Sequence, residues 1–317
     1  MLVYTFFIKR NFHNQIKSPI FYRYFTKDLN ISYIKNPYKA DIVMDKYKNR
    51  ENLNSSQMLI KIEGTQYLAN KILYTKVLNN LDQNGGYNGF NSTLFNPPSY
   101  SMNFQKIGIL TKDEKLFLSR NETGIWIMKP AATYGGTGIQ LIRNIESVKQ
   151  ALYQKLNNQT IDAIQDINLK YSSFTLQKYI DKPLLLKGEK KFDYRCYVFY
   201  VSSDPLIAVY VPGFIRETMV KYKQDSENLM THIGNGQFQR AYPNYWKKLR
   251  KSSYDMRLFK EKLLDKFPNL KEKDYYNLID KIKASLAYSI QSAKDKFKQN
   301  KGDFQIQGID IIGWKFL

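Results

Sequence analysis

The chain has 317 residues, of which 43% are hydrophobic and 15% aromatic, so it predicts a folded core and excludes an intrinsically disordered protein. Its 49 Lys and Arg residues against 28 Asp and Glu give a formal charge of +21. A charge of this size predicts an anionic partner, which could be nucleic acid, an acidic membrane surface or an acidic polypeptide, unless the basic surface is only solvated.

A single cysteine, Cys196, excludes an internal disulfide and favours a reducing compartment. The two histidines, His13 and His232, are too few for a multi-histidine metal site. No apolar run approaches the length that spans a membrane, and the first residues lack the features of a secretory signal. We expect a first β-strand there, with a mitochondrial presequence as the alternative.

The first third of the chain predicts strands, helices and one long loop. In chain order these are strands over residues 3–8 and 40–44, a weak helix at 21–25, a helix over 65–79, a loop over 84–103 and a helix over 113–120. The helix over 65–79 rests on an apolar stripe that runs from Leu68 to Val77 at helical spacing. The loop rests on its Gly, Asn, Ser and Pro content.

The stretch GIWIMKPAATYGGTGI at 124–139 combines a strand with a glycine-rich loop. Residues 124–128 predict a buried strand, Lys129 lies at its end, and Pro130 is expected to stop sheet pairing. The loop glycines are Gly135, Gly136 and Gly138. Such a loop lets backbone N–H groups approach phosphate oxygens while the lysine supplies positive charge. A plain turn is the alternative, and neither a Walker A loop nor a dinucleotide fingerprint is present.

The second half predicts further strands and a helical region. In order these are a helix at 145–156, strands over 173–180, 191–201 and 207–211, helices within 245–298 and a strand over 304–312. The Ser-Asp-Pro turn is expected to join the strands over 191–201 and 207–211 as a pair. Helices around a largely antiparallel sheet predict an α+β or mixed α/β fold, without internal repeats or a coiled coil.

Charged residues recur on the predicted strands. Lys191, Asp193 and Arg195 alternate along one strand and share one face, because residues two apart in a strand point the same way. Asp310 lies on the last strand, and residues 177–180 end another strand, where backbone groups could read an adenine edge. Cations for phosphates and carboxylates for Mg²⁺ suit phosphoryl transfer, whereas a solvent-facing edge strand is the alternative.

Six motifs in order resemble the tubulin–tyrosine ligase and ligase-like family: IWIMKP, GGTGI, LQKYIDKPLLL, KFDYR, HIGN and GIDII. The resemblance implies an ATP-grasp fold of mostly antiparallel sheets flanked by helices, with a small N-terminal α/β subdomain. It divides the chain into an N-terminal subdomain at 1–60, a central subdomain at 61–182 and a C-terminal subdomain at 183–317.

The resemblance also implies a role for each motif residue. Lys129 and Lys191 would hold the triphosphate beneath the glycine loop, and Asp310 would bind Mg²⁺. Adenine would lie against Gln177, Lys178, Tyr179 and Ile180. The reacting centre would comprise Asp193 in the nucleotide and acceptor site, Arg195 and Arg216 on the carboxylate of the incoming amino acid, and Asn235 near the phosphates. Arg216 as a surface arginine and His232 as a structural residue are the alternatives.

The activity implied by the resemblance is ATP-dependent amide formation through an acyl phosphate. Tyrosine is favoured as the added amino acid, because the opening YTFFIKR resembles the first strand of tubulin–tyrosine ligase; glutamate comes next and glycine third. The implied partners are the acidic tails of tubulin, microtubules and the free amino acid, with neither nucleic acid nor a membrane. The implied location is the cytoplasm, on the cytoskeleton or in a cilium.

Two positions depart from the family pattern. Gly234 stands where the family usually has threonine, so one hydroxyl near the nucleotide is lost. The family also carries a Glu-x-Asn pair of metal ligands after the GIDII strand, and we expect its absence to weaken Mg²⁺ binding. A truncated C-terminal subdomain, or a catalytically inactive relative that acts as a basic tubulin- or microtubule-binding module, are both consistent with this departure.

Overall fold

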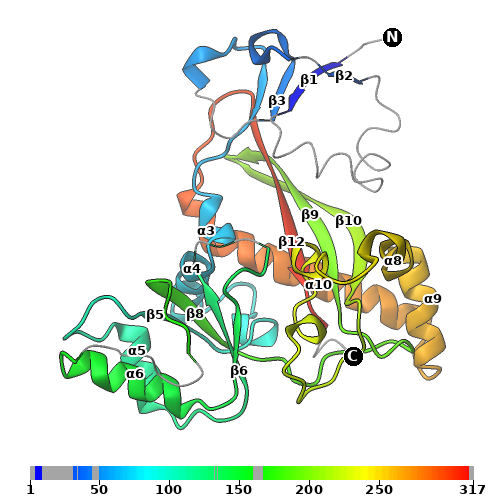
Figure 1. Ribbon diagram of the computed structural model, residues 1–317. Helices are drawn as coiled ribbons and strands as arrows, with labels where there is room; N and C mark the ends of the chain where they lie inside the picture. Colours follow the sequence, from blue (N-terminus) through cyan, green and yellow to red (C-terminus); the bar gives the residue numbers. More distant parts are fainter. Residues whose placement is uncertain are drawn as a thin grey trace.

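The computed structural model describes residues 4–8, 31–33, 35–44, 50–131, 133, 135–159 and 167–313 (Figure 1). Its strands form two sheets, one with the order β11-β10-β9-β12-β4-β3-β1-β2 and one with the order β5-β8-β6-β7. The fold is therefore mixed α/β, as the sequence predicts. Among the described residues, no helix is both long and apolar enough to cross a membrane.

The four-stranded sheet is antiparallel throughout and has one apolar and one polar face. Its strands are β5 (Ser99–Asn103), β8 (Ser173–Lys178), β6 (Trp126–Pro130) and β7 (Gln140–Ile142). The apolar face buries Trp126, Met128 and Phe174 against α5 (Lys112–Ser119) and α6 (Glu146–Leu156). The opposite face carries Lys129, Thr175 and Gln177, because alternate residues of a strand point to opposite faces. This polar face is turned away from α5 and α6.

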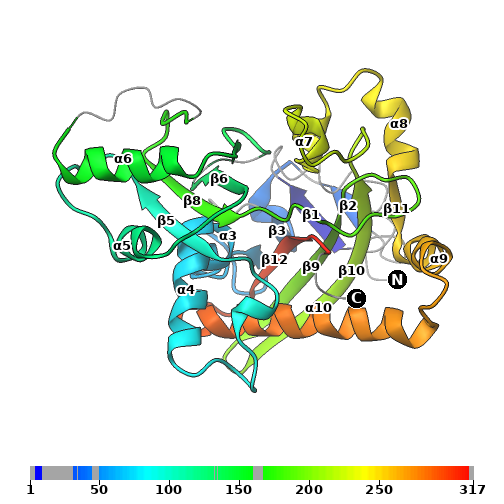
Figure 2. The same ribbon diagram turned by 90° about the horizontal axis from the view of Figure 1, so that it is seen from below.

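The antiparallel half of the large sheet is built on β9 (Phe192–Ser203), which pairs with β10 (Leu206–Glu217) and β12 (Asp303–Ile311). The short β11 (Ser253–Asp255) pairs with the end of β10. One face packs against α9 (Met256–Lys266) and α10 (Glu272–Ala293), through buried side chains such as Tyr194 and Cys196. Figure 2 shows α10 running across these strands. Two short helices, α7 (Gly236–Gln239) and α8 (Tyr245–Ser252), precede β11.

The N-terminal part extends the same sheet with parallel strands. They are β1 (Tyr4–Ile8), β2 (Ile31–Tyr33), β3 (Ile42–Met44) and β4 (Met58–Ile60), and β4 pairs in parallel with β12. Two helices, α3 (Gln66–Ala69) and α4 (Lys71–Gln83), then lead to the four-stranded sheet. The short 3-10 helices are η1 (Pro37–Lys39), η2 (Arg50–Asn52), η3 (Ser92–Leu94), η4 (Leu229–Thr231) and η5 (Lys294–Lys296).

Most predicted elements are present within a few residues of their expected bounds, and three expectations were wrong. The helix over 65–79 is interrupted at Asn70, whose side chain accepts the N–H groups of Ile72 and Leu73 and so begins a new helix. The loop over 84–103 ends in β5. Pro130 lies within β6 opposite Phe174, at the strand's last position. The predicted pattern at 21–25 lies outside the described residues, and the division into three subdomains stays a prediction.

A buried ion pair fixes the four-stranded sheet to its helices. Lys155 of α6 and Glu114 of α5 are fully buried and 2.5 Å apart, and Lys155 also donates to the carbonyl of Asn103. The other Glu114 oxygen accepts the N–H of Asn103 at 2.7 Å. All of these groups depend on one another, because burial removes the water that would otherwise solvate them.

We expect Lys155→Met to lower the free energy of unfolding by about 3–5 kcal/mol, because it leaves the Glu114 carboxylate buried without its cation. The matched control is Lys187→Met, which removes an exposed ion pair with Asp265 and should change stability by less than about 1 kcal/mol. Urea unfolding of the unmodified chain and the two variants measures both changes in the free energy of unfolding. Equal effects of the two substitutions would contradict this account of the buried pair.

Candidate functional site

Strand pairing brings four charged residues together on one face of the large sheet. Asp193 of β9 lies opposite Arg216 of β10, and Arg195 of β9 lies opposite Asp310 of β12. Asp193 and Arg195 are two residues apart, so all four side chains share the face that α9 and α10 do not cover. This face was predicted for Asp193 and Arg195 from alternation in the sequence. The structure adds Arg216 and Asp310 to it.

Arg216 connects the two carboxylates of this cluster. Its Nε lies 2.7 Å from Asp193 Oδ1, and its Nη2 lies 2.8 Å from Asp310 Oδ1. Arg195 Nη1 lies 2.6 Å from the same Asp310 oxygen. Two carboxylates and two guanidinium groups balance in charge, although Arg216 Nη2 is buried without a hydrogen bond of good geometry. The Asp310 side chain is 39% exposed and therefore accessible to a ligand.

The two carboxylates differ in acidity. Burial raises the pKa of Asp193 to about 6, although Arg216 opposes the effect. Burial would also raise the pKa of Asp310, but Arg216 and Arg195 outweigh it and hold this pKa below its ordinary value. Asp310 is thus the firmly ionised member at neutral pH, which is the state that a cation requires.

Three lysines converge next to this cluster from different elements. Lys129 Nζ on β6 donates to Gln177 Oε1 at 2.7 Å, and Lys191 Nζ, just before β9, donates to the Tyr179 hydroxyl at 2.9 Å. Lys71 Nζ, on the first residue of α4, donates to the carbonyls of Pro130 and Thr133 at 3.1 Å. Within the described ranges, none of these three lysines has a carboxylate within ion-pair distance.

The pKa values of these lysines are lowered first by burial and, for Lys129 and Lys191, also by neighbouring positive charge. Burial and the nearby Lys71 lower the pKa of Lys129 to about 8. Burial and Lys129 lower the pKa of Lys191 to about 7, against an opposing effect of Asp193. Burial also lowers the pKa of Lys71. Buried cations of like charge are unfavourable unless an anion binds between them, so the three lysines predict an anion site.

A chain of hydrogen bonds holds Lys191 in place. The Tyr179 hydroxyl, which accepts from Lys191, lies 2.8 Å from Nδ1 of His232, and His232 Nε2 lies 2.7 Å from the carbonyl of Ser226. A carbonyl only accepts, so Nε2 carries the proton and Nδ1 accepts from Tyr179. Burial lowers the pKa of His232, which matches this neutral form. His232 therefore has a structural role beside the site.

The glycine loop packs against the segment that contains HIGN. A Cβ on Gly135 would lie 2.5 Å from Gln237 Cδ, and both Gly135 (φ +72°) and Gly138 (φ +72°) adopt backbone conformations that favour glycine. Asn235 caps α7 by accepting the N–H of Gln237 at 2.9 Å. A Cβ on Gly234 would lie 3.0 Å from Asp193 Oδ2. The missing threonine hydroxyl would therefore have stood beside the charged cluster.

Two cofactor residues predicted at the end of β8 lie apart from the lysines. The Lys178 side chain points to the opposite face of the sheet, where it donates to the carbonyl of Thr123 and lies 5.2 Å from the Trp126 ring centre. Ile180 follows the strand end and is half-buried. The Lys178 side chain is therefore directed away from a ligand on the polar face. Gln177 and Tyr179 contact the lysines directly.

Lys71 is a site residue that sequence reasoning missed. Its signal was a lysine at the first position of a helix, directly after the Asn70 cap, where the helix dipole disfavours positive charge. A cation at such a position needs a compensating anion. The lysine is 58 residues from Lys129 in sequence, so no local pattern connects the two.

The chain offers few metal ligands. No group of three or more His, Cys, Asp or Glu residues that could hold a metal gathers in the described part of the chain. Asp310 and Asp193 are the two carboxylates at the site. Mg²⁺ is commonly bound by one or two carboxylates together with phosphate oxygens and water. The donor set therefore fits Mg²⁺ held jointly by the protein and a phosphate ligand.

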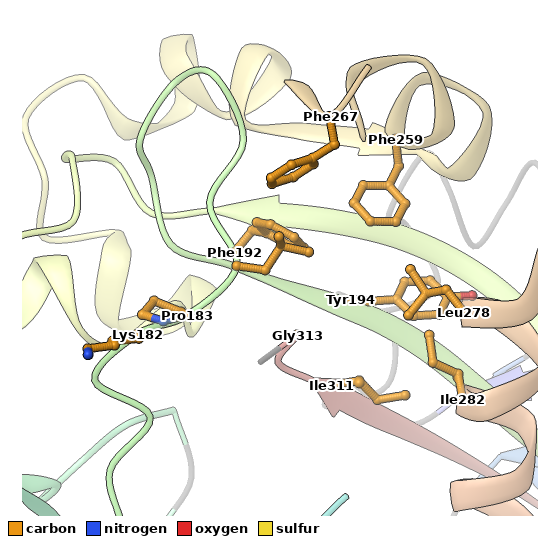
Figure 3. Close-up of a pocket in the computed structure, with 11 residues that line it drawn as sticks. Lys182, Pro183, Phe192, Tyr194, Phe259, Phe267, Leu278, Ile282, Ile311 and Gly313 are labelled. Atoms are coloured by element: carbon orange, nitrogen blue, oxygen red, sulfur yellow. The ribbon is translucent and has the colours of Figure 1, made fainter. Parts of the chain in front are cut away.

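An apolar cavity lies on the other face of the large sheet. It has a volume of about 280 Å³. Figure 3 shows Phe192, Tyr194 and Ile311 from the sheet surrounding it with Phe259, Leu278 and Ile282 from the helices. None of the charged site residues lines it, so the cavity is separate from the anion site.

Residues 48–315 match the Tubulin-tyrosine ligase family. "Protein polyglycylase TTLL10" of Macaca fascicularis is 30% identical over 210 residues, which cover 63% of this chain and 33% of that protein. "Inactive polyglycylase TTLL10" of Homo sapiens is 30% identical over 205 residues, covering 63% and 30%. "Probable alpha-tubulin polyglutamylase Ttll1" of Tetrahymena thermophila is 30% identical over 200 residues, covering 61% and 45%.

The matches cover most of this chain but only part of each relative. The matched part of the chain spans about a third of the two TTLL10 relatives and less than half of the third. The family match covers most of the chain and includes all six motifs, whereas the opening strand that favoured tyrosine lies before it. The resemblance seen in the sequence is confirmed. The chain belongs to the tubulin-tyrosine ligase family.

Proposed function

We propose that the chain is an ATP-dependent carboxylate–amine ligase that adds an amino acid to the acidic tails of tubulin. The observation that carries this proposal is the convergence, beside the Arg195–Arg216 cluster, of buried Lys191 with half-buried Lys71 and Lys129, none of which has a carboxylate partner among the described residues. A triphosphate supplies the missing negative charge. The family implies the ATP-grasp fold and the use of ATP, and the predicted three-subdomain division goes with that fold.

In this proposal each group of residues has one task. Lys71, Lys129 and Lys191 bind the phosphates, and the loop around Gly135 covers them. Gln177 orients Lys129, and Tyr179 orients Lys191, while the backbone of residues 177–180 faces adenine. Asp310 and Asp193 would hold Mg²⁺ together with the phosphates, and the ion would supply charge neutralisation for phosphoryl transfer.

The guanidinium groups serve the second half of the reaction. ATP phosphorylates the acceptor carboxylate, and the amine of the incoming amino acid then attacks the acyl phosphate, forming the C–N bond and releasing phosphate. Arg195 and Arg216 bind the carboxylate of that amino acid and stabilise negative charge at the reacting carbon. Asn235, at the start of α7, completes the site near the phosphates. Arg216 exchanges its present partner Asp310 for this substrate.

The relatives' names bear on which amino acid is added. The opening strand favoured tyrosine, with glutamate next, whereas the relatives described above are named polyglycylases and a polyglutamylase. We therefore treat glycine, glutamate and tyrosine as the three candidates. A tubulin substrate would place the enzyme on the cytoskeleton or in a cilium within the cytoplasm.

A second function is supported by one relative and one feature of the site. The human relative is named an inactive polyglycylase. In this chain Arg216 and Arg195 already neutralise Asp193 and Asp310. A member of the family that binds tubulin without catalysis would retain the basic surface and could keep these ion pairs between the two arginines and the two carboxylates.

Incorporation of radiolabelled glycine, glutamate or tyrosine into purified tubulin, in the presence of ATP, tests the two functions. We expect one of the three amino acids to be incorporated. Arg216→Lys, which keeps the charge but loses the planar fork, should lower incorporation at least about tenfold while changing ATP affinity by less than about threefold. Tubulin binding without incorporation of any of the three would favour the inactive module.

We expect Lys191→Ala to weaken ATP binding at least about thirtyfold, because it removes a buried cation aimed at the phosphates. The matched control is Lys178→Ala, whose side chain points to the opposite face of the same sheet and should leave affinity within about threefold. Isothermal titration calorimetry measures both. The melting temperature of Lys191→Ala should not fall, since Lys191 has no ion-pair partner to leave unpaired. Equal ATP affinities of the two variants would refute the phosphate role.

ATP affinity should also fall as pH rises. The pKa values of Lys191 and Lys129 are about 7 and about 8. Below pH 7 both lysines are mostly charged before ATP binds. Above pH 7 they must take up protons on binding, because the bound phosphates raise both pKa values. Affinity should drop at least about tenfold from about pH 7 to about pH 9. Calorimetry near pH 8 in two buffers of different ionisation enthalpy should show net proton uptake, reduced in Lys191→Met. A flat pH profile without proton uptake would contradict this.

A further inference from the structure

The segment from residue 228 to residue 254 is basic and contains no acidic residue. Its cations include Arg240 and three lysines of α8, Lys247, Lys248 and Lys251, all of them exposed. In the part of the chain that the structure describes, none of these four cations has a carboxylate within ion-pair distance. The segment therefore presents a continuous stretch of uncompensated positive charge.

This segment borders the proposed active site at both ends. It includes Asn235, which caps α7, and α8 continues directly into β11 (Figure 2), whose first residue Ser253 pairs with Arg216. Between these ends, burial raises the pKa of the Tyr245 hydroxyl, and the positive charges of Arg240 and, to a smaller extent, Arg216 lower it in part. Arg240, which follows α7, and the lysines of α8 thus lie on the segment that joins Asn235 to the strand paired with Arg216.

An exposed aromatic residue is fixed among these cations. Trp246 is 67% exposed, and its ring lies 5.1 Å from the Arg240 guanidinium and 5.2 Å from the Tyr245 ring. Lys248 lies 4.5 Å from the centre of the Tyr242 ring and donates to its hydroxyl at 3.1 Å. These contacts hold Arg240 and Lys248 in place before a partner arrives, which lowers the conformational entropy that these two side chains lose on binding.

We propose that Arg240, Trp246, Lys247, Lys248 and Lys251 form the surface, named here the α8 surface, that docks an extended glutamate-rich polypeptide and leads it to Arg216. Lys247 and Lys251 are four residues apart on one helix face, a rise of about 6 Å. Alternate side chains of an extended peptide lie about 6.8 Å apart, so successive glutamates on one side of the peptide match these lysines. Without an anion, two like charges at this spacing destabilise the helix.

The inference rests on the proposed function only in taking the docked chain as the acceptor. A carboxylate polymer is favoured over nucleic acid because the surface leads to the proposed reacting centre, where the acceptor group that ATP phosphorylates is a carboxylate. The binding experiment below requires no catalysis, so its result is separate from that of the ligase assay.

The test is fluorescence anisotropy of a fluorescein-labelled octaglutamate peptide with the whole chain. Lys247→Glu/Lys248→Glu/Lys251→Glu should weaken binding at least about tenfold at low salt and remove most of its salt dependence. Trp246→Ala, which leaves the charge unchanged, should weaken binding about threefold or more through loss of the fixed Arg240. ATP affinity, measured by calorimetry, should stay within about twofold in both and so report an intact fold.

The matched control moves the same charge on a distant surface. Lys106, Lys112 and Lys115 are exposed residues on and before α5, which Figures 1 and 2 both place far from α8. Lys106→Glu/Lys112→Glu/Lys115→Glu changes the net charge equally and should leave peptide affinity within about threefold. Equal losses in the two triple variants would overturn the proposal, since only the total charge would matter. The proposal would also be overturned if the α8 triple variant kept its affinity for the peptide. It would likewise be overturned if the unmodified chain bound octauridylate and not the peptide, and the α8 triple variant lost the octauridylate binding.

Discussion

The ion pairs of Arg216 are the interactions on which the site depends, because from β10 this residue joins a carboxylate of β9 to a carboxylate of β12. Its two ion pairs, to Asp193 and to Asp310, cross the antiparallel centre of the large sheet. The position is set by backbone register, which is fixed by the apolar residues on the other face against α9 and α10. A slip of one residue would turn the charged side chains into the core. The same packing that stabilises the sheet therefore sets the geometry of the site.

The lysines beside this cluster show the opposite balance. The Asp–Arg cluster balances its own charges, whereas the hydrogen bonds of Lys71, Lys129 and Lys191 go to neutral oxygens: two carbonyls, an amide and a hydroxyl. Lys191 also lies over the Tyr179 ring. Such partners orient an ammonium group without neutralising it, so the site keeps an attraction for anions that an internal ion pair would abolish. Burial, and then the neighbouring positive charge, lowers the pKa values of Lys129 and Lys191. The like-charged lysines destabilise the protein without a ligand, and an anion that binds between them removes this cost.

The sequence predicted local features well and long-range pairing less well. Alternating side chains placed Asp193 and Arg195 on one face, and the apolar run before Lys129 predicted β6. Lys71 was missed, because its neighbours in space come from residues 129 to 191. The opposite directions of Gln177 and Lys178 could have been read from strand alternation. The pairing of Arg216 with Asp193 depends on a bulge between Val211 and Phe214 that no residue pattern announces.

Only some of the cations behind the net charge of the chain lie next to the proposed site. A formal +21 spread over the surface attracts any polyanion at long range and selects none of them. Selection requires cations held at fixed spacing next to the chemistry, which is what α8 supplies by ending at the strand beside Arg216. Charge on α5 adds to the general attraction but leads to no reacting group. The position of a lysine relative to the strand ends, more than the number of lysines, then decides which acidic chain reaches the site.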